Sequence, residues 1–367
     1  MRSQISQEGG RPMAPKYQSV ADSLRQEIED GVYSSKQLLP TEHSLCQRFQ
    51  ISRQTVRRAL SVLEDEGLIT RRQGSGSRLR ERIGPEALLN CTVAVVTTYI
   101  NDYIFPGILR GMERILTANS SAPLLFATQN QVSIERKILQ TLLTIKDLDG
   151  VLMEGSKTAL PDPNLDLYQK LIDRGVRLVF INGTYPELSS IPSVLADNYG
   201  GGRMLVGYLH QKGHQNIAGI FKNDDMQGTL RYAGYIEALR DLGLPLEDRQ
   251  ICWYNTEMRE SFLSEPFLDR TLDSFSGCSA IVCYNDEVAI RVVSHLRKRG
   301  VQIPQEMAVV SFDDSQYSEL APVRITSLSH GGQNLGELAA DLMLRQLRGE
   351  TCRSVVVPWV LAEKESS

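Results

Sequence analysis

The chain has little of what a metal site or a membrane segment requires. Its six cysteines never form a C-x-x-C pair and its five histidines do not cluster, so the sequence predicts no zinc site and no other metal centre. No apolar run is long enough to cross a membrane, and we find no secretory signal peptide. We therefore expect a cytoplasmic protein with reduced cysteines, most of them in the apolar core.

Motifs for nucleotide binding and for catalysis are missing as well. There is no G-x-x-x-x-G-K-S/T phosphate loop, no G-x-G-x-x-G directly after a strand, and no G-x-S-x-G elbow around a nucleophile. The three glycines at 200–202 stand before an apolar helix and are typical of a helix start instead. The sequence therefore predicts neither a cofactor nor an enzyme.

What is present is the composition of an ordinary globular protein, with 41% hydrophobic and 23% charged residues. A length of 367 residues indicates two or three folding units. The net charge of −4 hides an asymmetry, because a basic N-terminal part precedes an acidic remainder. The first residues are polar, and we expect a disordered tail over residues 1–14.

Residues 40–69 are the most informative part of the chain, because they predict two short amphipathic helices separated by a tight turn. Thr41 with Ser44 offers a start for the first helix, and Ser52 is a good N-cap for the second. Apolar residues recur in the second helix at helical spacing, at Val56, Ala59, Leu60 and Leu63. Its opposite face carries Arg53, Gln54, Thr55, Arg57 and Arg58. Such side chains bond phosphates and base edges, so the pattern predicts a helix-turn-helix.

The next residues favour DNA binding over a helix hairpin with a solvated basic face. Residues 68–70 predict a strand, residues 71–77 a basic, glycine-rich turn, and the following residues a second strand. This is the wing of a winged helix, whose tip can reach a groove or backbone beside the recognition helix.

Residues 15–82 resemble the GntR family of winged-helix regulators. The resemblance rests on the phrases at 40–42, 52–57, 67–69 and 73–76. It implies operator contacts from Glu42, Arg53, Arg57 and Gln73, and phosphate contacts from Ser52 and Thr55. A capping role is an equal alternative for Glu42. The full set of expected DNA-binding residues is Lys16, Glu42, Ser52, Arg53, Gln54, Thr55, Arg57, Arg72, Gln73 and Gly74.

A linker over residues 83–91 leads to a second unit, in which strands and helices alternate. Apolar runs typical of strands lie at 93–98, 124–128, 150–154, 177–182, 217–221, 280–285 and 308–312. Alternation of this kind predicts an α/β fold with doubly wound parallel sheets. The strands are too many for one small sheet, so we expect two interleaved lobes within 92–362, roughly 92–196 and 197–323, with the C-terminal segment crossing back.

Ligands of open parallel sheets bind beyond the carboxyl ends of the strands. The residues at those ends are rich in carboxylates, amides and aromatic rings, a combination that suits a polyhydroxylated ligand. We expect effector contacts from Tyr99, Asp102, Phe105, Glu154, Asn182, Arg231, Asn285 and Asp313. Other polar residues follow the strands at Tyr103, Lys157, Tyr185, Asp224, Asp225, Gln227, Asp286 and Asp314. Such residues also cap helices, and that alternative stands for Asp286.

Residues 92–362 are similar to the effector domain of the LacI/GalR family, which shares its two-lobed fold with periplasmic sugar-binding proteins. The similarity rests on the phrases at 107–111, 149–152, 197–201, 231–235, 283–289 and 309–314. It implies that Arg231, Asn285 and Asp313 hold the effector.

A GntR-type head on a LacI/GalR-type body resembles the arabinose repressors of Gram-positive bacteria, also in the phrases at 97–106 and 221–228. The resemblance implies L-arabinose as the effector; the residues alone indicate a small polar sugar or polyol. We predict a repressor that binds a pseudo-palindromic operator in double-stranded DNA as a homodimer, joined through apolar helix faces at Ile108, Met112 and Ile115. A sugar-processing enzyme or sugar-binding protein with a DNA-binding head, a regulator of another sugar, and an activator are the alternatives.

Overall fold

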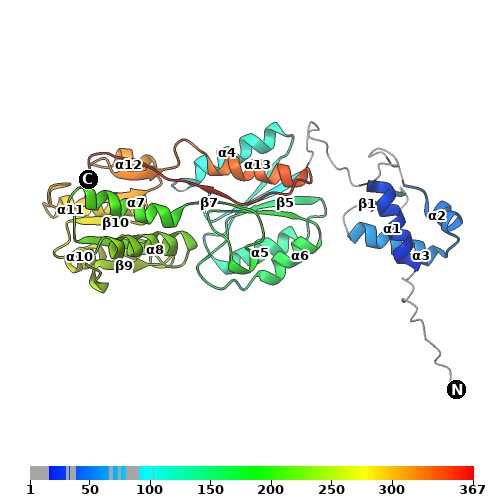
Figure 1. Ribbon diagram of the computed structural model, residues 1–367, viewed down its shortest axis with the longest axis horizontal. Coiled ribbons are helices and arrows are strands. Elements are labelled where there is room, and N and C mark those ends of the chain that lie inside the picture. The colour runs from blue at the N-terminus through cyan, green and yellow to red at the C-terminus, as the bar shows by residue number, and fades with distance from the viewer. Residues whose placement is uncertain are drawn as a thin grey trace, which may run out of the picture. The chain divides into compact units, whose positions relative to one another are not determined.

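The computed structural model describes residues 16–29, 33, 39–65, 69–72, 76–79, 91–101 and 103–367 (Figure 1). The chain divides into two compact units, Met1–Pro85 and most of Glu86–Ser367. The expected tail and nearly all of the expected linker lie outside the described residues, as do Gln73, Gly74 and Asp102. The side chains of Lys16 and Arg72 also lie outside the description.

The first unit is a bundle of three helices followed by a two-stranded wing. Its elements are α1 (Lys16–Glu29), α2 (Glu42–Phe49), α3 (Arg53–Asp65), β1 (Ile69–Arg72) and β2 (Gly76–Leu79). The Thr41 hydroxyl caps α2 by accepting from Ser44 N at 3.2 Å, as the sequence predicts. The apolar stripe of α3 is buried against α1 and α2, in a core made of Val20, Ala21, Leu24, Leu39, Leu45, Val56, Ala59, Leu60, Leu63 and Ile69.

The two wing strands pair antiparallel, with Ile69 opposite Leu79 and Arg72 opposite Gly76. A backbone hydrogen bond of 2.9 Å from Leu39 N to Ser77 O ties the wing to the segment before α2. The wing is therefore anchored to the same core that orients α3.

The second unit contains two α/β lobes, each built on a six-stranded sheet (Figure 1). The first lobe has a wholly parallel sheet in the order β13-β7-β6-β5-β3-β4. Its elements are β3 (Thr92–Thr97), α4 (Phe105–Ala118), β4 (Pro123–Ala127), α5 (Val132–Leu142), β5 (Leu148–Met153), α6 (Leu165–Asp173), β6 (Arg177–Ile181), η1 (Pro186–Leu188), β7 (Ser193–Ala196), α13 (Leu335–Leu347) and β13 (Val355–Val357).

The second lobe has the order β14-β12-β11-β10-β8-β9, parallel except for β14. Its elements are α7 (Asn198–Gln211), β8 (Ile217–Lys222), α8 (Met226–Asp241), η2 (Asp248–Gln250), β9 (Ile251–Tyr254), α9 (Arg259–Phe262), α10 (Glu265–Ser274), β10 (Ala280–Cys283), α11 (Asp286–Lys298), β11 (Ala308–Phe312), α12 (Gln316–Leu320), β12 (Thr326–Ser329) and β14 (Val360–Ala362). Apolar clusters cover both faces of its sheet, as parallel sheets require.

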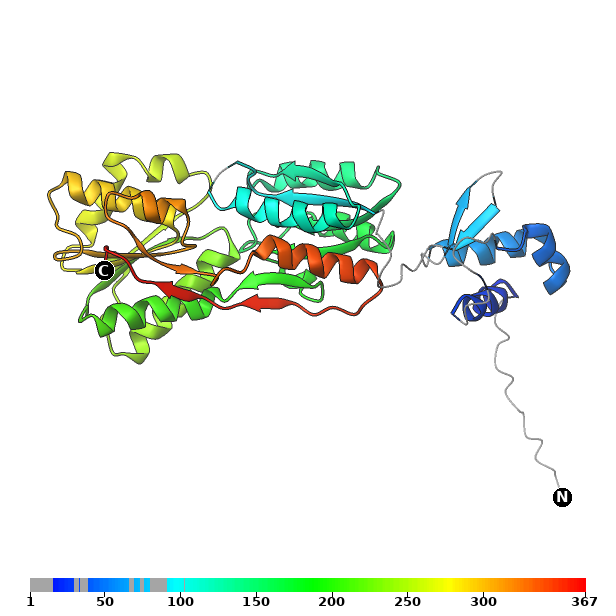
Figure 2. The ribbon, with the colours of Figure 1, turned by 90° about the horizontal axis from the view of Figure 1, so that it is seen from above.

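Three chain segments connect the lobes: β7 to α7, β12 to α13, and β13 to β14. Figure 2 shows the last of these as the red C-terminal segment that runs from one lobe into the other. Trp359 lies on this segment, 5% exposed, with its ring stacked on His330 at a centroid distance of 4.1 Å. Both lobes are therefore discontinuous in the sequence.

The predicted fold class is confirmed, and all seven predicted strands of the second unit correspond to β3, β4, β5, β6, β8, β10 and β11. One expectation is wrong: Met112 is only 3% exposed and belongs to the core beneath α4, so it cannot contribute to a subunit interface. Among the described residues, no helix is long and apolar enough to span a bilayer.

Candidate functional site

A cavity of about 820 Å³, counting the open space at its mouth, lies between the lobes at the carboxyl ends of their strands. Residues from both lobes line it: Thr98, Tyr99, Tyr103, Ile104, Phe105, Asn130, Glu154, Gly155, Thr158, Asn182 and Gly183 from the first, and Lys222, Asp225, Gln227, Arg231, Tyr254, Arg259, Tyr284, Asn285, Glu287 and Asp313 from the second. The wall is therefore polar on both sides, with aromatic rings between the polar groups.

Arg231, on α8, is the most firmly held cation of this wall. Its Nε donates to Asn198 Oδ1 at 2.9 Å, one Nη donates to the carbonyl oxygen of Tyr284, and the other donates to Asp313 Oδ1 at 3.1 Å. The guanidinium also lies 4.2 Å from the ring centroid of Phe312. Burial acts to lower the pKa of Arg231, but Asp313 raises it above its ordinary value, so the group stays charged.

Asp313, directly after β11, connects Arg231 to the first lobe. Its backbone lies in the left-handed region, with φ of 93°, which a non-glycine residue seldom adopts. The second carboxylate oxygen accepts from Tyr103 Oη at 2.7 Å. The same hydroxyl accepts from Asp286 N at 3.1 Å. Tyr103 therefore bridges the lobes at the cavity wall.

Glu154, directly after β5, collects the donors of the first lobe. One carboxylate oxygen accepts from Thr98 N at 2.8 Å, Thr98 Oγ1 at 2.6 Å and Thr97 Oγ1 at 3.0 Å. The other accepts from Asn182 Nδ2 at 2.8 Å. This leaves Asn182 Oδ1 buried without a hydrogen-bond partner among the described residues. Asn182 itself lines the cavity.

Lys222, at the end of β8, is a further cation of the wall that the sequence-based prediction did not include. Its Nζ lies 3.0 Å from Asp224 Oδ1 and 2.9 Å from Asp225 Oδ2. Burial acts to lower the pKa of Lys222, but the two carboxylates raise it well above its ordinary value. Asp225 also caps α8 by accepting from Gly228 N at 2.7 Å. The lysine is thus charged and fixed by its acidic neighbours.

The remaining polar wall comes from the second lobe. The side-chain oxygen of Asn285 caps α11 by accepting from Val288 N at 3.0 Å, while the residue still lines the cavity. The guanidinium of Arg259 is paired with the carboxylate of Glu287 and lies 5.4 Å from the ring centroid of Tyr99. These contacts fix a charged pair and an aromatic ring side by side.

Among the described residues, every cation of the wall is paired with an acidic side chain of the wall, and the acids outnumber the cations by four to three. Its three cations, Lys222, Arg231 and Arg259, each have an acidic partner within hydrogen-bond distance. Its fourth acidic side chain, Glu154, is bonded by hydroxyl, amide and backbone donors. An arrangement without a spare cation suits a neutral ligand that offers many hydroxyl groups.

The structure brings together seven of the eight expected effector residues, namely Tyr99, Phe105, Glu154, Asn182, Arg231, Asn285 and Asp313. The eighth, Asp102, lies outside the described residues. Among the other strand-end residues, Asp286 is buried and bonded to Ser315 and Ser327, and Tyr185 lies behind the wall against Glu135. The sequence-based set omitted Lys222, Arg259, Tyr254 and Tyr284. Two of these could have been found: Lys222 directly follows the strand predicted at 217–221, and Tyr284 lies in the strand predicted at 280–285.

The exposed face of α3 is the candidate DNA-binding surface of the first unit. Ser52, Arg53, Gln54 and Arg57 are exposed and Thr55 is half-buried. The Ser52 hydroxyl caps α3 by accepting from Thr55 N at 3.3 Å, as predicted. Ser52, Arg53, Gln54 and Thr55 therefore lie together at the N-terminal end of α3, where the backbone N–H groups also favour a phosphate.

Glu42 is not a free acid on this basic surface. Its two carboxylate oxygens accept from Arg57 Nε at 3.2 and 3.0 Å, so the first residue of α2 orients an arginine of α3. Two other arginines are held elsewhere: Arg48 pairs with Glu27, and Arg58 lies 4.6 Å from the ring centroid of Tyr17. Arg57 is thus pre-oriented at the surface, where its side chain is 63% exposed.

Comparison with known proteins agrees with this division of the chain. The family described as "Bacterial regulatory proteins, gntR family" matches residues 16–79, and a "Periplasmic binding protein-like domain" matches residues 206–367. Proteins called "Arabinose metabolism transcriptional repressor" from Halalkalibacterium halodurans and Geobacillus stearothermophilus are both 34% identical, over 92% and 91% of this chain and 91% of each relative. The chain belongs to this repressor family.

The family's two-lobed unit also has solved relatives. The crystal structure of the transcription regulator CcpA of Lactococcus lactis superposes with a TM-score of 0.66 at 23% identity, covering 76% of this chain and 99% of that one. The predicted resemblances to the GntR and LacI/GalR families and to arabinose repressors are therefore confirmed. Such relatives are transcriptional regulators, as the DNA-binding unit predicts.

Proposed function

We propose that the protein is a transcriptional repressor that leaves its operator when L-arabinose binds in the cavity between the lobes. The observation that carries this proposal is the wall itself: each cation has an acidic partner, and one amide oxygen of a lining residue, Asn182 Oδ1, has no hydrogen-bond partner among the described residues. The relatives are named as repressors of arabinose metabolism, which supports a pentose as the ligand.

The contacts proposed for the sugar come from both lobes. Arg231, Asn285 and Asp313 would bond ring hydroxyls from one side, and Glu154 with Asn182 from the other. Tyr99 and Phe105, whose ring centroids are 5.7 Å apart, would pack against the C–H face of the sugar. A ligand held by both lobes favours their closed arrangement, because it loses half its contacts when they separate.

The output would be a change in DNA affinity. One recognition helix reads one half-site, so we propose that two copies of the chain bind a pseudo-palindromic operator in the cytoplasm. Arg53, Gln54 and Arg57 would reach base edges, and Ser52 with Thr55 would hold phosphates. Lobe closure would then change the spacing of the two reading helices and lower operator affinity.

The test measures operator affinity at fixed salt with and without saturating L-arabinose, together with calorimetric titration against a panel of pentoses and hexoses. We expect L-arabinose to weaken operator binding by about 5- to 150-fold, and DNA to weaken sugar binding by the same factor. A second sugar that binds and releases DNA more strongly would correct the ligand, and an operator affinity that no sugar changes would refute the proposal.

A further inference from the structure

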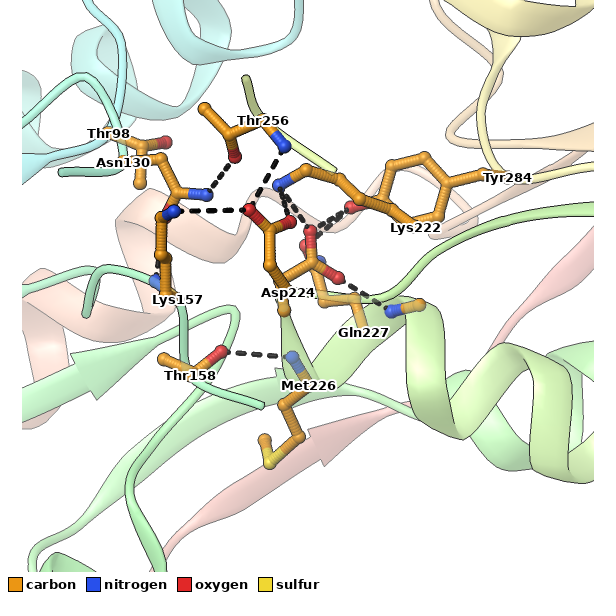
Figure 3. A network of polar contacts seen from close by, with 12 residues as sticks. Thr98, Asn130, Lys157, Thr158, Lys222, Asp224, Met226, Gln227, Thr256 and Tyr284 are labelled. Atoms are coloured by element: carbon orange, nitrogen blue, oxygen red, sulfur yellow. Dashed lines mark hydrogen bonds and ion pairs between the residues drawn. The ribbon is translucent and has the colours of Figure 1, made fainter. Parts of the chain in front are cut away.

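At one rim of the cavity, a set of polar groups joins the two lobes directly (Figure 3). We call this set the clasp. Its members are Asn130, Lys157 and Thr158 on the first lobe and Asp224, Met226, Thr256 and Glu257 on the second. Lys157, Asp224, Thr256 and Glu257 do not line the cavity, so a bound ligand need not touch them.

Three interactions of the clasp cross from lobe to lobe at hydrogen-bond distance. Asn130 Nδ2 donates to Thr256 Oγ1 at 2.5 Å, and Met226 N, at the first residue of α8, donates to Thr158 Oγ1 at 3.0 Å. The third is ionic: Lys157 Nζ bonds the Glu257 carboxylate. Each of these is broken when the lobes separate.

The first-lobe side of the clasp holds an unusual backbone. Gln129, Asn130 and Lys157 have φ of 53°, 55° and 50°, in the left-handed region that non-glycine residues seldom adopt. A hydrogen bond of 2.8 Å from Lys157 N to Asn130 Oδ1 joins the two loops. Strained backbone of this kind persists only where surrounding contacts over-determine it. The loops are thus shaped to present Asn130 and Lys157 to the other lobe.

Asp224 connects the clasp to the cavity wall. It is 3% exposed, and one of its oxygens lies 3.0 Å from Nζ of Lys222, a residue of the wall. The other oxygen accepts from Thr256 N at 3.0 Å and lies 4.0 Å from Lys157 Nζ (Figure 3). The Asp224 carboxylate therefore contacts both Lys222, which lines the cavity, and the loop at Thr256, which bonds to the first lobe.

We propose that the clasp holds the lobes closed and sets the sugar concentration at which the operator is released, with Lys157 and Asp224 as positioning residues that never contact the sugar. The proposal rests on the proposed function for its second half, since release of DNA is what the sugar concentration controls. Its first half, that the clasp holds the lobes together, stands on the interlobe contacts alone.

The first test uses Lys157→Gln, Glu257→Gln and the double variant. Partly exposed ion pairs shift a two-state equilibrium by about 1.5- to 5-fold, so each single variant should raise the half-maximal L-arabinose concentration by roughly that factor. The double variant should be no worse than Lys157→Gln alone, because Lys157→Gln already removes the pair with Glu257. Thr256→Val leaves the buried Asn130 amide without its acceptor, and should give a larger rise, about 5- to 150-fold.

Lys298→Gln and Glu265→Gln are matched controls, because these residues also form an ion pair but both belong to the second lobe. Both controls should leave the half-maximal concentration unchanged. Additive effects of Lys157→Gln and Glu257→Gln, or effects no larger than those of the controls, would overturn the proposal.

A second readout separates failure of the clasp from failure of the proposed function. Exchange of the Met226 amide hydrogen needs no sugar and no DNA, and its partner, Thr158 Oγ1, lies on the opposite lobe. In sugar-free protein, Lys157→Gln should speed exchange in a peptide spanning 222–230 by about 1.5- to 5-fold, and Lys298→Gln should not. If L-arabinose does not bind the wild type, the proposed function fails while this comparison still decides the clasp. Equal exchange in wild type and Lys157→Gln overturns the clasp whatever the sugar does.

The Asp224→Asn variant tests the connection to the wall. The amide keeps an oxygen for Thr256 N but removes the charge that Lys222 and Lys157 share. We expect the factor by which sugar weakens operator binding to fall by several fold, while operator affinity without sugar is not lowered. If Asp224 had only a structural role, saturating sugar would weaken operator binding by the same factor in Asp224→Asn as in wild type. An unchanged factor would therefore remove Asp224 from the proposal.

Discussion

Arg231 and Asp313 lie 3.1 Å apart, Nη2 to Oδ1, with only 2% and 7% of their side-chain surfaces exposed. They come from α8 and from the turn after β11, so the pair joins two elements of the second lobe beneath the cavity. A buried pair is costly to break because the remaining charge is left without compensation. The pair is therefore both a proposed ligand contact and a determinant of the lobe's stability.

Replacement of Arg231 by Ala should abolish the response to sugar and leave operator binding in its absence. It should also lower the free energy of unfolding by about 3–5 kcal/mol, because Asp313 loses its partner. Asp313→Asn is the gentler variant, since its amide oxygen can still accept from Arg231. Calorimetry with L-arabinose and chemical denaturation measure the two effects separately. A normal sugar response from a folded Arg231→Ala protein would place the ligand elsewhere.

Glu154→Gln should weaken sugar binding without loss of the fold. The two carboxylate oxygens of Glu154 accept from four donors. In glutamine an NH2 group replaces one of these oxygens and cannot accept, so at least one donor is left without a partner. A buried donor left in that way costs about 1–3 kcal/mol, or roughly 5- to 150-fold in the dissociation constant. Titration calorimetry measures it. Gln227→Glu at the same cavity serves as a comparison, since Gln227 has one long contact of 3.5 Å from Tyr284 Oη.

Gly234→Ala should destabilise the second unit strongly. A β-carbon at this position would meet the carbonyl oxygen of Tyr199 at 2.0 Å, so α7 and α8 would have to move apart. Gly202 faces α8 in the same way, 2.2 Å from the carbonyl oxygen of Arg231. We expect a loss of at least about 1–3 kcal/mol in the free energy of unfolding. Gly207→Ala is the control. Gly207 lies on α7, as Gly202 does, but a β-carbon there would meet no atom within 4 Å, so the substitution should be neutral or stabilising.

Glu42→Gln should reduce sequence discrimination more than it reduces DNA binding. The glutamine amide keeps one oxygen for Arg57 Nε but loses the second acceptor and the charge, so Arg57 is oriented less firmly while the surface gains net positive charge. The ratio of operator affinity to random-sequence affinity should fall, with random-sequence affinity unchanged or higher. Arg57→Ala should cost about 1–3 kcal/mol at the operator. Competition binding at fixed salt is the measurement, and an unchanged ratio for Glu42→Gln would return Glu42 to a capping role.

Stability should depend on pH through Asp286. Burial, together with the charge of Asp313, raises the pKa of Asp286 to about 7. Between pH 4 and 7 the folded state then keeps a proton that the unfolded state has released. The free energy of unfolding therefore falls as pH rises through this window, by roughly 4 kcal/mol from this group if its full shift is realised. Asp162, whose pKa burial also raises to about 7, adds a slope of the same sign.

Denaturation followed by tryptophan fluorescence isolates this effect, because the two tryptophans, Trp253 and Trp359, both belong to the second unit. Asp286→Asn should remove part of the slope and leave the part due to Asp162. A pH dependence of stability that is the same in wild type and in Asp286→Asn would contradict the buried, protonated state of Asp286.

The sequence was sufficient to predict the seven strands that carry the cavity and seven of its lining residues, for a definite physical reason. Parallel strands end at one edge of their sheet, so Glu154 and Asn182 of the first lobe could be brought together from the strand pattern alone, as could Arg231's partner Asp313 with Asn285 in the second lobe. Lys222 was missed because its significance depends on two carboxylates that follow it and fold back. Tyr254 was missed because β9 is short and was not predicted.

Other features depend on contacts between distant segments and leave no local signal. β13 and β14 contain three residues each and exist through their pairing with β7 and β12. The interlobe contacts of Lys157 with Glu257 link residues 100 positions apart. The glycine at 202 was correctly placed at a helix start, but its close approach to α8 required coordinates.

The three crossings between the lobes also determine when each part of the protein can be complete during synthesis. The DNA-reading unit has all of its elements once β2 has been made, at residue 79. Neither lobe has its full sheet until β13 and β14 emerge, at residues 355–362. Because domains fold as units from the N-terminus, the first unit is complete long before the two-lobed second unit. A ribosome-bound chain therefore passes through a stage in which the DNA-binding unit is complete but the two-lobed unit, through which we propose that the sugar releases DNA, is not.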